Sequence, residues 1–190
     1  MKLKILLLLV FFSLKLRAQV VDDALLFVPY AATLGLDFCG VEAHHPFPER
    51  LALTATSFAS LTVTAGALKL AVDERRPDGS NYRSFPSGHA ARAFAGAELV
   101  RSEYGWACGA AAYALATTVG VLRVTGDHHY THDVVAGAAI GIASTRLAYW
   151  LLPLEKKLLG WDNENMTVSA LPAYNHDTRS FGVALTATLY

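Results

Sequence analysis

The sequence predicts an all-α protein: an antiparallel bundle of about five helices, followed by a short C-terminal β-hairpin. Three observations support this fold class. More than half of the 190 residues are apolar, the apolar segments are rich in Ala and Leu and long enough for helices, and turn signals separate them. The length is sufficient for one hydrophobic core and too short for two ordinary domains.

Residues 1–18 have the pattern of a signal peptide. Lys2 and Lys4 precede the apolar run Ile5–Phe12, and Ala18 provides a small residue at the expected cleavage point. The alternative is an uncleaved N-terminal anchor, although this apolar run is short for a full membrane span.

Residues 19–160 are expected to form the helical domain. Its five predicted helices are Asp22–Phe38, Leu51–Val72, Ser87–Tyr104, Trp106–Leu122 and a last one from Thr131 to just before Pro153. Pro29 interrupts the first of these segments. Gly105 predicts a tight reversal between the third and the fourth.

Two loops and a C-terminal extension complete the expected fold. Gly40–Arg50 contains two prolines, and Asp73–Phe85 contains a strong cluster of turn residues. Within the extension, residues 161–190, the segments Met166–Leu171 and Phe181–Tyr190 alternate in polarity and are rich in Val, Thr and Leu. Such segments are typical of short strands, and the polar residues between them predict the turn of a hairpin.

The composition limits the partners and cofactors. The formal net charge is zero, so no basic surface for nucleic acid is expected. No group of Cys, His or carboxylate residues has the spacing of a metal site, so we expect no metal and no other cofactor to be required. Cys39 and Cys108 are expected to be free, buried thiols, and nothing in the sequence indicates an obligate protein partner.

Three short motifs carry the chemistry. In chain order they are Lys69 with Arg76-Pro77, then Pro86-Ser87-Gly88-His89, then Arg123 with His129 and Asp133. Together they supply three cations, a turn with a hydroxyl group, two histidines and one carboxylate. That set is sufficient to hold a phosphate group and to attack it through a histidine nucleophile.

The order of the predicted helices explains how these motifs can meet. The second helix ends at the first motif, the third helix begins at the second motif, and the third motif joins the fourth helix to the fifth. If successive helices are antiparallel, all three motifs lie at one end of the bundle. The reversals at Gly40–Arg50 and Gly105 then lie at the opposite end.

Five residues are predicted to bind phosphate. Ser87 and Gly88 open a helix, so free backbone N–H groups and the positive end of the helix dipole face an anion. Arg76 and Arg123 can each bind two phosphate oxygens, and Lys69 adds a point charge.

Three residues are predicted to be catalytic. His129 is the candidate nucleophile, and Asp133, one helical turn later, can hold one imidazole nitrogen so that the other faces phosphorus. His89 is the candidate general acid, which protonates the departing alkoxide. His128 and His132 are expected to be structural, because neighbouring helix residues point in other directions.

At these residues the chain closely resembles the superfamily of type-2 phosphatidic acid phosphatases, bacterial class A acid phosphatases and vanadium haloperoxidases. The resemblance spans about residues 50–152, and the chain departs from the family pattern at Leu122, where that pattern prefers Ser. The resemblance implies an all-helical bundle, a covalent phosphohistidine intermediate at His129, metal independence and inhibition by vanadate.

The first hypothesis for the function is a membrane-bound phosphatase. It would hydrolyse a phosphate monoester or diphosphate of a lipid of the lipid A, isoprenyl diphosphate or phosphatidate type. Three predicted helices, 51–72, 106–122 and 131–153, are apolar nearly all round and about as long as a bilayer span. The helix 87–104 carries Arg92, Glu98 and Arg101, which a lipid-exposed span would tolerate poorly.

An exported N-terminus would place the site on the periplasmic face of a bacterial-type cell envelope. Two alternatives remain open. One is a soluble periplasmic acid phosphatase acting on small phosphomonoesters. The other is a vanadate-dependent haloperoxidase, in which His129 would bind vanadate.

Overall fold

The fold of the chain is described by a computed structural model, which covers residues 25–161, 166–175 and 180–189. The elements are the apolar helical segment Leu25–Cys39, whose last turn is the 3-10 helix η1 (Leu36–Cys39), then α2 (Phe47–Ala71), α3 (Gly88–Thr125), α4 (Thr131–Leu159), β1 (Met166–Asn175) and β2 (Ser180–Leu189). The predicted, mainly helical fold class is confirmed. The predicted signal peptide or anchor, residues 1–18, lies outside the described residues.

Helix α3 consists of two antiparallel arms that meet at Gly105. This glycine has φ 75° and ψ −175°, a conformation that other residues rarely adopt. The ring centroids of Phe94 and Tyr113 are 6.0 Å apart, whereas a straight helix would separate these positions by about 28 Å. The two arms correspond to the helices predicted at 87–104 and 106–122. The predicted count of five separate helices is not confirmed, because no loop separates these arms.

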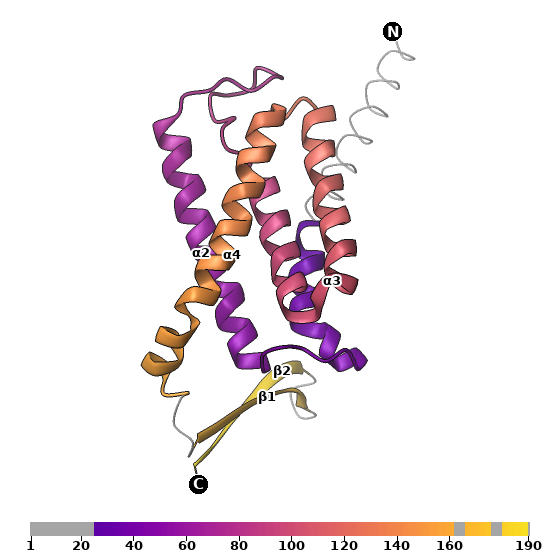
Figure 1. Cartoon of the computed structure of the whole chain (residues 1–190), viewed down its shortest axis with the longest axis vertical. Helices are drawn as coiled ribbons and strands as arrows, with labels where there is room; N and C mark the ends of the chain where they lie inside the picture. Colours follow the sequence, from indigo (N-terminus) through magenta and orange to yellow (C-terminus); the bar gives the residue numbers. More distant parts are fainter. Residues whose placement is uncertain (1–24, 162–165, 176–179, 190) are drawn as a thin grey trace.

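The motif-bearing segments lie at one end of the bundle. Figure 1 shows the loop between α2 and α3 beside the short connection from α3 to α4, both at the top of the view. The Gly105 reversal and the connection from Cys39 to α2 lie at the opposite end. The antiparallel order of the helices therefore gathers residues that are far apart in the sequence.

Two predicted helix boundaries and the predicted burial of the cysteines are wrong. α2 begins at Phe47 rather than Leu51, because Pro48 occupies the first turn, where its missing N–H costs no hydrogen bond. α4 continues through Pro153 to Leu159, although a proline inside a helix removes one backbone hydrogen bond. Cys39 and Cys108 are free, as expected, but Cys39 is exposed and Cys108 is only half-buried, so neither is the buried thiol that was predicted.

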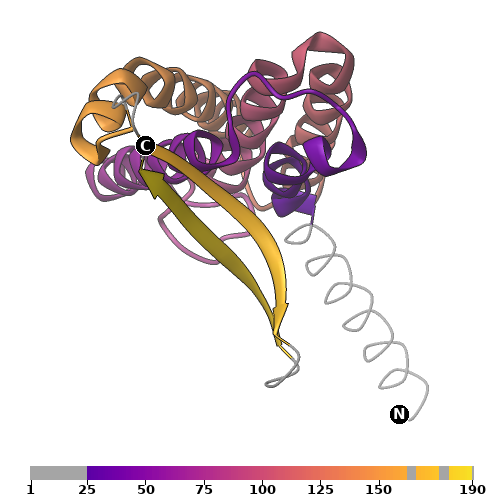
Figure 2. The same ribbon diagram turned by 90° about the horizontal axis from the view of Figure 1, so that it is seen from below.

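The strands β1 and β2 pair antiparallel. Their register runs from Met166 opposite Leu189 to Asn175 opposite Ser180. β1 contacts α2, and Figure 2 shows the pair extending away from the helices. Residues 176–179 lie outside the described residues, so the predicted hairpin turn stays a prediction.

The first arm of α3 and the first half of α4 pack with their backbones in close contact. A Cβ atom on Gly137 would lie 2.3 Å from the carbonyl oxygen of Ser87, and one on Gly141 would lie 2.2 Å from the carbonyl oxygen of Ala91. These glycines and Asp133 recur at every fourth residue and therefore share one face of α4. The close packing allows the Ser87 N–H to donate to the Asp133 carbonyl oxygen at 2.9 Å.

The outer surface of the bundle is largely apolar. α2, α3 and α4 are each long and apolar enough to cross a membrane, and only 22–28% of their most apolar windows is buried within the protein. Of the charges noted on the first arm of α3, Glu98 faces inward, whereas Arg92 and Arg101 are partly exposed. Glu98 is buried and pairs with Arg101 and Arg146, with N–O distances of 2.6 Å in both pairs.

We expect Gly141→Ala to destabilise the protein by about 1–3 kcal/mol, because the new methyl group must displace backbone rather than a flexible side chain. Gly66→Ala is the matched control. No atom lies within 4 Å of a Cβ at this position in α2, and replacing a helical glycine with alanine is favourable by about 0.5–1 kcal/mol. Thermal unfolding of both variants in detergent measures the difference. Equal melting temperatures would contradict the close packing of α3 on α4.

Candidate active site

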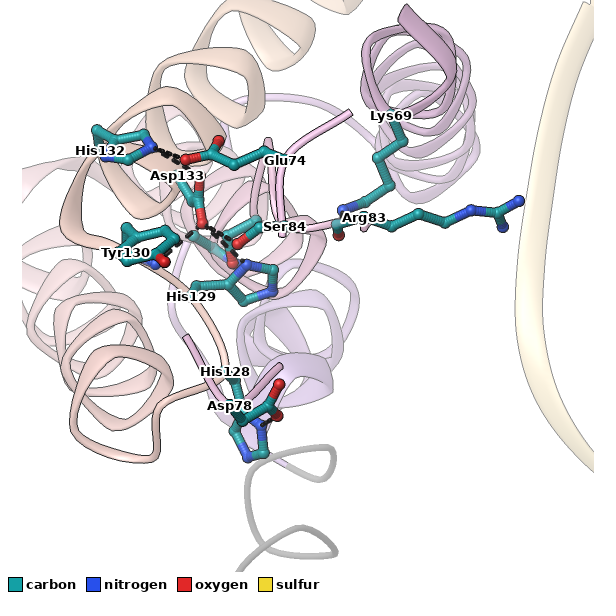
Figure 3. Close-up of polar contacts among 12 residues, drawn as sticks. Lys69, Glu74, Asp78, Arg83, Ser84, His128, His129, Tyr130, His132 and Asp133 are labelled. Carbon is teal, nitrogen blue, oxygen red and sulfur yellow. Dashed lines mark hydrogen bonds and ion pairs between the residues drawn. The ribbon is translucent and has the colours of Figure 1, made fainter. Parts of the chain in front are cut away.

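The site is assembled from the loop 72–87, the loop 126–130 and the first turns of α3 and α4. Backbone hydrogen bonds hold these segments: the Asp78 N–H donates to the Asp127 carbonyl oxygen at 3.0 Å and joins the two loops, and the Ser84 N–H donates to the Glu74 carbonyl oxygen at 3.0 Å within the loop 72–87. Figure 3 shows the side chains that converge there. The site is therefore held by backbone contacts that do not depend on the catalytic side chains.

His129 and Asp133 form a buried pair at the centre of the site. The distance from Nδ1 of His129 to Oδ2 of Asp133 is 3.4 Å, and the two residues are 2% and 0% exposed. Ser84 donates its hydroxyl hydrogen to the same Oδ2, and the Tyr130 N–H donates to it at 2.9 Å. The predicted partnership of His129 with Asp133 is therefore present in the geometry.

Asp133 also caps α4. It occupies the third position of the helix and accepts the hydrogen of the Tyr130 N–H, which precedes the first turn. A carboxylate in this place satisfies a donor that the helix leaves unpaired and interacts favourably with the helix dipole. The orientation of the carboxylate towards His129 is thus fixed by the same contacts that start the helix.

Lys69 and Arg76 place positive charge near His129. Lys69 lies at the end of α2, and its ammonium group donates to the carbonyl oxygen of Arg83 at 3.0 Å (Figure 3). Nε of Arg76 is buried and has no hydrogen-bond partner among the described residues. A buried, unsatisfied guanidinium nitrogen is expected where an anion is to bind.

The pKa of His129 is lowered from its ordinary value of 6.5 to about 4. Burial is the largest cause, followed by the positive charges of Arg76 and Lys69, while Asp133 acts in the opposite direction. The imidazole is therefore neutral at physiological pH. With the proton on Nδ1, towards Asp133, the lone pair on Nε2 is available for attack.

The remaining predicted phosphate ligands lie at helix ends beside this pair. Ser87 precedes the first residue of α3 and its hydroxyl oxygen accepts the Ala90 N–H at 3.4 Å, so Gly88 opens the helix as predicted. Arg123 is buried in the last turn of α3, and its carbonyl oxygen accepts the N–H groups of both His128 and His129. His89 lies in the first turn of α3 and is half-buried. Its role as a general acid stays a prediction.

Three residues at the site were not predicted to take part. Ser84 is fully buried and holds Asp133. Nε2 of His132, a residue expected to be merely structural, lies 2.7 Å from Oε1 of Glu74 and 3.3 Å from Oδ1 of Asp133. Ser84 and Glu74 belong to a loop without periodicity, so no spacing in the sequence indicated their partners.

Comparisons with known proteins agree with this fold. Residues 50–157, more than half of the chain, match the PAP2 superfamily. The chain therefore belongs to that family. It is 34% identical over 139 residues to the lipid A 1-phosphatase of Porphyromonas gingivalis, an alignment that covers 70% of this chain and 31% of that protein. The chain thus spans about a third of the length of this relative.

A solved structure has the same fold. The crystal structure of Aquifex aeolicus LpxE matches with a TM-score of 0.55 and 23% sequence identity. The match covers 69% of this chain and 84% of that one. At this level of identity the likeness shows the shared helical fold.

The acid limb of the pH profile of kcat/KM is expected near pH 4, after correction for the titration of the substrate. His129 must be neutral to attack, and its lowered pKa of about 4 keeps it neutral at every higher pH. Activity should therefore be retained as the pH falls through 6.5 and should be lost near 4. An acid limb at 6.5 or above would show that burial and the neighbouring cations do not act on the essential histidine.

Proposed function

We propose that this chain is a membrane-bound, metal-independent phosphatase that removes phosphate from a lipid through a phosphohistidine intermediate at His129. The observation that carries the proposal is the buried, neutral His129, held by Asp133 and placed among cationic side chains. Membership of the PAP2 superfamily supports the same chemistry.

In the first step, Nε2 of His129 attacks the phosphorus atom. Arg76, Arg123 and Lys69 bind the phosphate oxygens, together with the N-terminus of α3. As the N–P bond forms, the bond from phosphorus to the lipid oxygen breaks, and its electron pair remains on that oxygen. His89 supplies the proton that this alkoxide needs.

In the second step, water attacks the phosphohistidine. His89, left neutral by the first step, accepts a proton from the attacking water, the oxygen of water bonds to phosphorus, the N–P bond breaks, and inorganic phosphate leaves while His129 regains its neutral form and His89 its proton. Asp133 stabilises the positive charge that the imidazole carries in the intermediate. The reaction needs no redox partner, and the cations of the site supply the charge stabilisation that a metal supplies in other phosphatases.

The membrane location is supported by the surface of the helices and by the place of the site. Large apolar side chains are exposed along α2 and α4, such as Val63 (71%), Leu70 (82%) and Trp150 (76%). α2 has 25 residues and is about 37 Å long, which is sufficient for the hydrocarbon core of a bilayer. Because the site lies at the end of the bundle (Figure 1), it would meet a lipid at the level of the head group.

The substrate class follows from the similar protein. The relative from Porphyromonas gingivalis is a lipid A 1-phosphatase, and we extend this substrate class, a phosphorylated glycolipid of the lipid A type, to the present chain. In this proposal residues 1–18 direct export or anchor the chain, residues 19–160 form the phosphatase domain and residues 161–190 form a C-terminal extension. The active site faces the periplasm.

His129→Ala should lower the release of inorganic phosphate from lipid A by about 10³-fold or more, because no other residue of the site can form the covalent intermediate. The assay uses the full chain in detergent micelles with excess chelator. His44→Ala is the matched control, since His44 is exposed and precedes α2 at the opposite end of the bundle.

Circular dichroism and melting curves show whether each variant is folded. Turnover near the wild-type level in folded His129→Ala would refute the proposed nucleophile. Loss of wild-type activity in chelator, with recovery on adding Mg²⁺, would refute metal independence.

A further inference from the structure

A second group of side chains lies on the side of Asp133 that faces away from His129. Glu74, His132 and Asp133 each offer one ligand atom, and these three atoms lie within 4.8 Å of one another. Figure 3 shows His132 and Glu74 approaching Asp133 from above, while His129 lies below it. Oδ2 of Asp133 therefore faces His129, whereas Oδ1 of the same carboxylate faces His132.

The hydrogen bonding of this group is incomplete. Nε2 of His132 lies 2.7 Å from Oε1 of Glu74 and 3.3 Å from Oδ1 of Asp133. A neutral imidazole carries one hydrogen, so Nε2 can donate to only one of these two carboxylates. Oδ1 of Asp133 is buried and accepts no hydrogen bond within the described part of the chain, which is costly for a carboxylate oxygen.

The donor atoms are held in place before any ligand binds. The imidazole of His132 stacks on two rings, those of Tyr130 (centroids 5.4 Å apart, 8° between planes) and Phe85 (6.3 Å, 28°). The backbone of Glu74 is fixed by the hydrogen bond from Ser84 N–H. The side chain of His132 is 59% exposed and that of Glu74 is 27% exposed, so an ion can enter from solvent.

We propose that Glu74, His132 and Asp133 form a binding site for a divalent transition-metal ion of the zinc type, which adjoins the phosphate site and shares Asp133 with it. One imidazole nitrogen and two carboxylate oxygens are a donor set that zinc accepts, with water in the remaining position. The ion takes the place of the Nε2 hydrogen, and His132 then carries its proton on Nδ1. The ion satisfies Glu74 and the unpaired Oδ1 of Asp133 at the same time.

Occupancy of this site should slow phosphoryl transfer, a consequence that rests on the proposed function. Asp133 stabilises the positive charge of His129 through Oδ2, and an ion on Oδ1 withdraws negative charge from the same carboxylate. The metal is thus an inhibitor that acts through Asp133. Glu74 and His132 are not among the residues that bind or transfer phosphate in the proposed reaction, although His132 lies 3.3 Å from Oδ1 of Asp133.

Binding is tested first, with the metal-stripped full chain in detergent and Zn²⁺ in competition with a chromophoric chelator. We expect one Zn²⁺ per wild-type chain, and affinity lowered by at least about 10-fold in both Glu74→Gln and His132→Gln. His44→Gln, which removes an exposed histidine far from the group, should bind as the wild type does. Wild-type affinity in both site variants, or no saturable binding at one ion per chain, would overturn the proposal.

Activity is tested second, by titrating Zn²⁺ into the phosphate-release assay. The wild type and His44→Gln should lose activity over the concentration range in which the site fills, while Glu74→Gln and His132→Gln should resist. Equal inhibition of all four proteins would overturn the inhibitory role. A chain that binds Zn²⁺ as expected but releases no phosphate from lipids would refute the proposed function and leave the metal site intact.

Discussion

The close contact between the beginnings of α3 and α4 determines the rest of the site. Without side chains at Gly137 and Gly141, the backbone of α4 lies against the carbonyl groups of Ser87 and Ala91. The hydrogen bond from Ser87 N–H to the Asp133 carbonyl oxygen joins the two helix ends directly. The open N-terminus of α3, which favours an anion, is thereby placed beside the carboxylate that orients the nucleophile. A larger residue on this face of α4 would move the anion-binding N-terminus of α3 away from the Asp133 carboxylate that orients His129.

Asp133 is the residue through which structure and chemistry are coupled. A buried carboxylate is stable only with partners, and its Oδ2 has three: the Ser84 hydroxyl, the Tyr130 N–H and His129. Two of these partners are structural, so the carboxylate keeps its orientation whatever the state of the histidine. Burial and, to a smaller extent, the neighbouring cations lower the pKa of His129 and keep it neutral. A bound phosphate neutralises the charge of these cations, which connects binding of the substrate to the stability of the charged intermediate.

The sequence predicted the parts of this arrangement that depend on helix order. Motifs at helix ends, together with alternating helix directions, were enough to place Lys69, Ser87 and His129 at one end of the bundle. The sequence could not predict Ser84 or Glu74, because their contacts depend on how an aperiodic loop folds over α4. The continuation of α4 through Pro153 also escaped prediction, because a proline inside a helix removes one backbone hydrogen bond and can kink the helix without ending it. The role of His132 was missed for a related reason: its partner, Glu74, is distant in the sequence.

The central claim is that His129 carries the phosphoryl group during turnover. The most direct test is to mix the full chain with lipid A labelled with ³²P at its phosphate, to stop the reaction in alkaline denaturant, and to map the label by mass spectrometry. Our account predicts a transient phosphoryl group on the peptide that contains His129, stable in base and labile in acid. Label on a different residue, or turnover in which no labelled protein forms at any time, would contradict it.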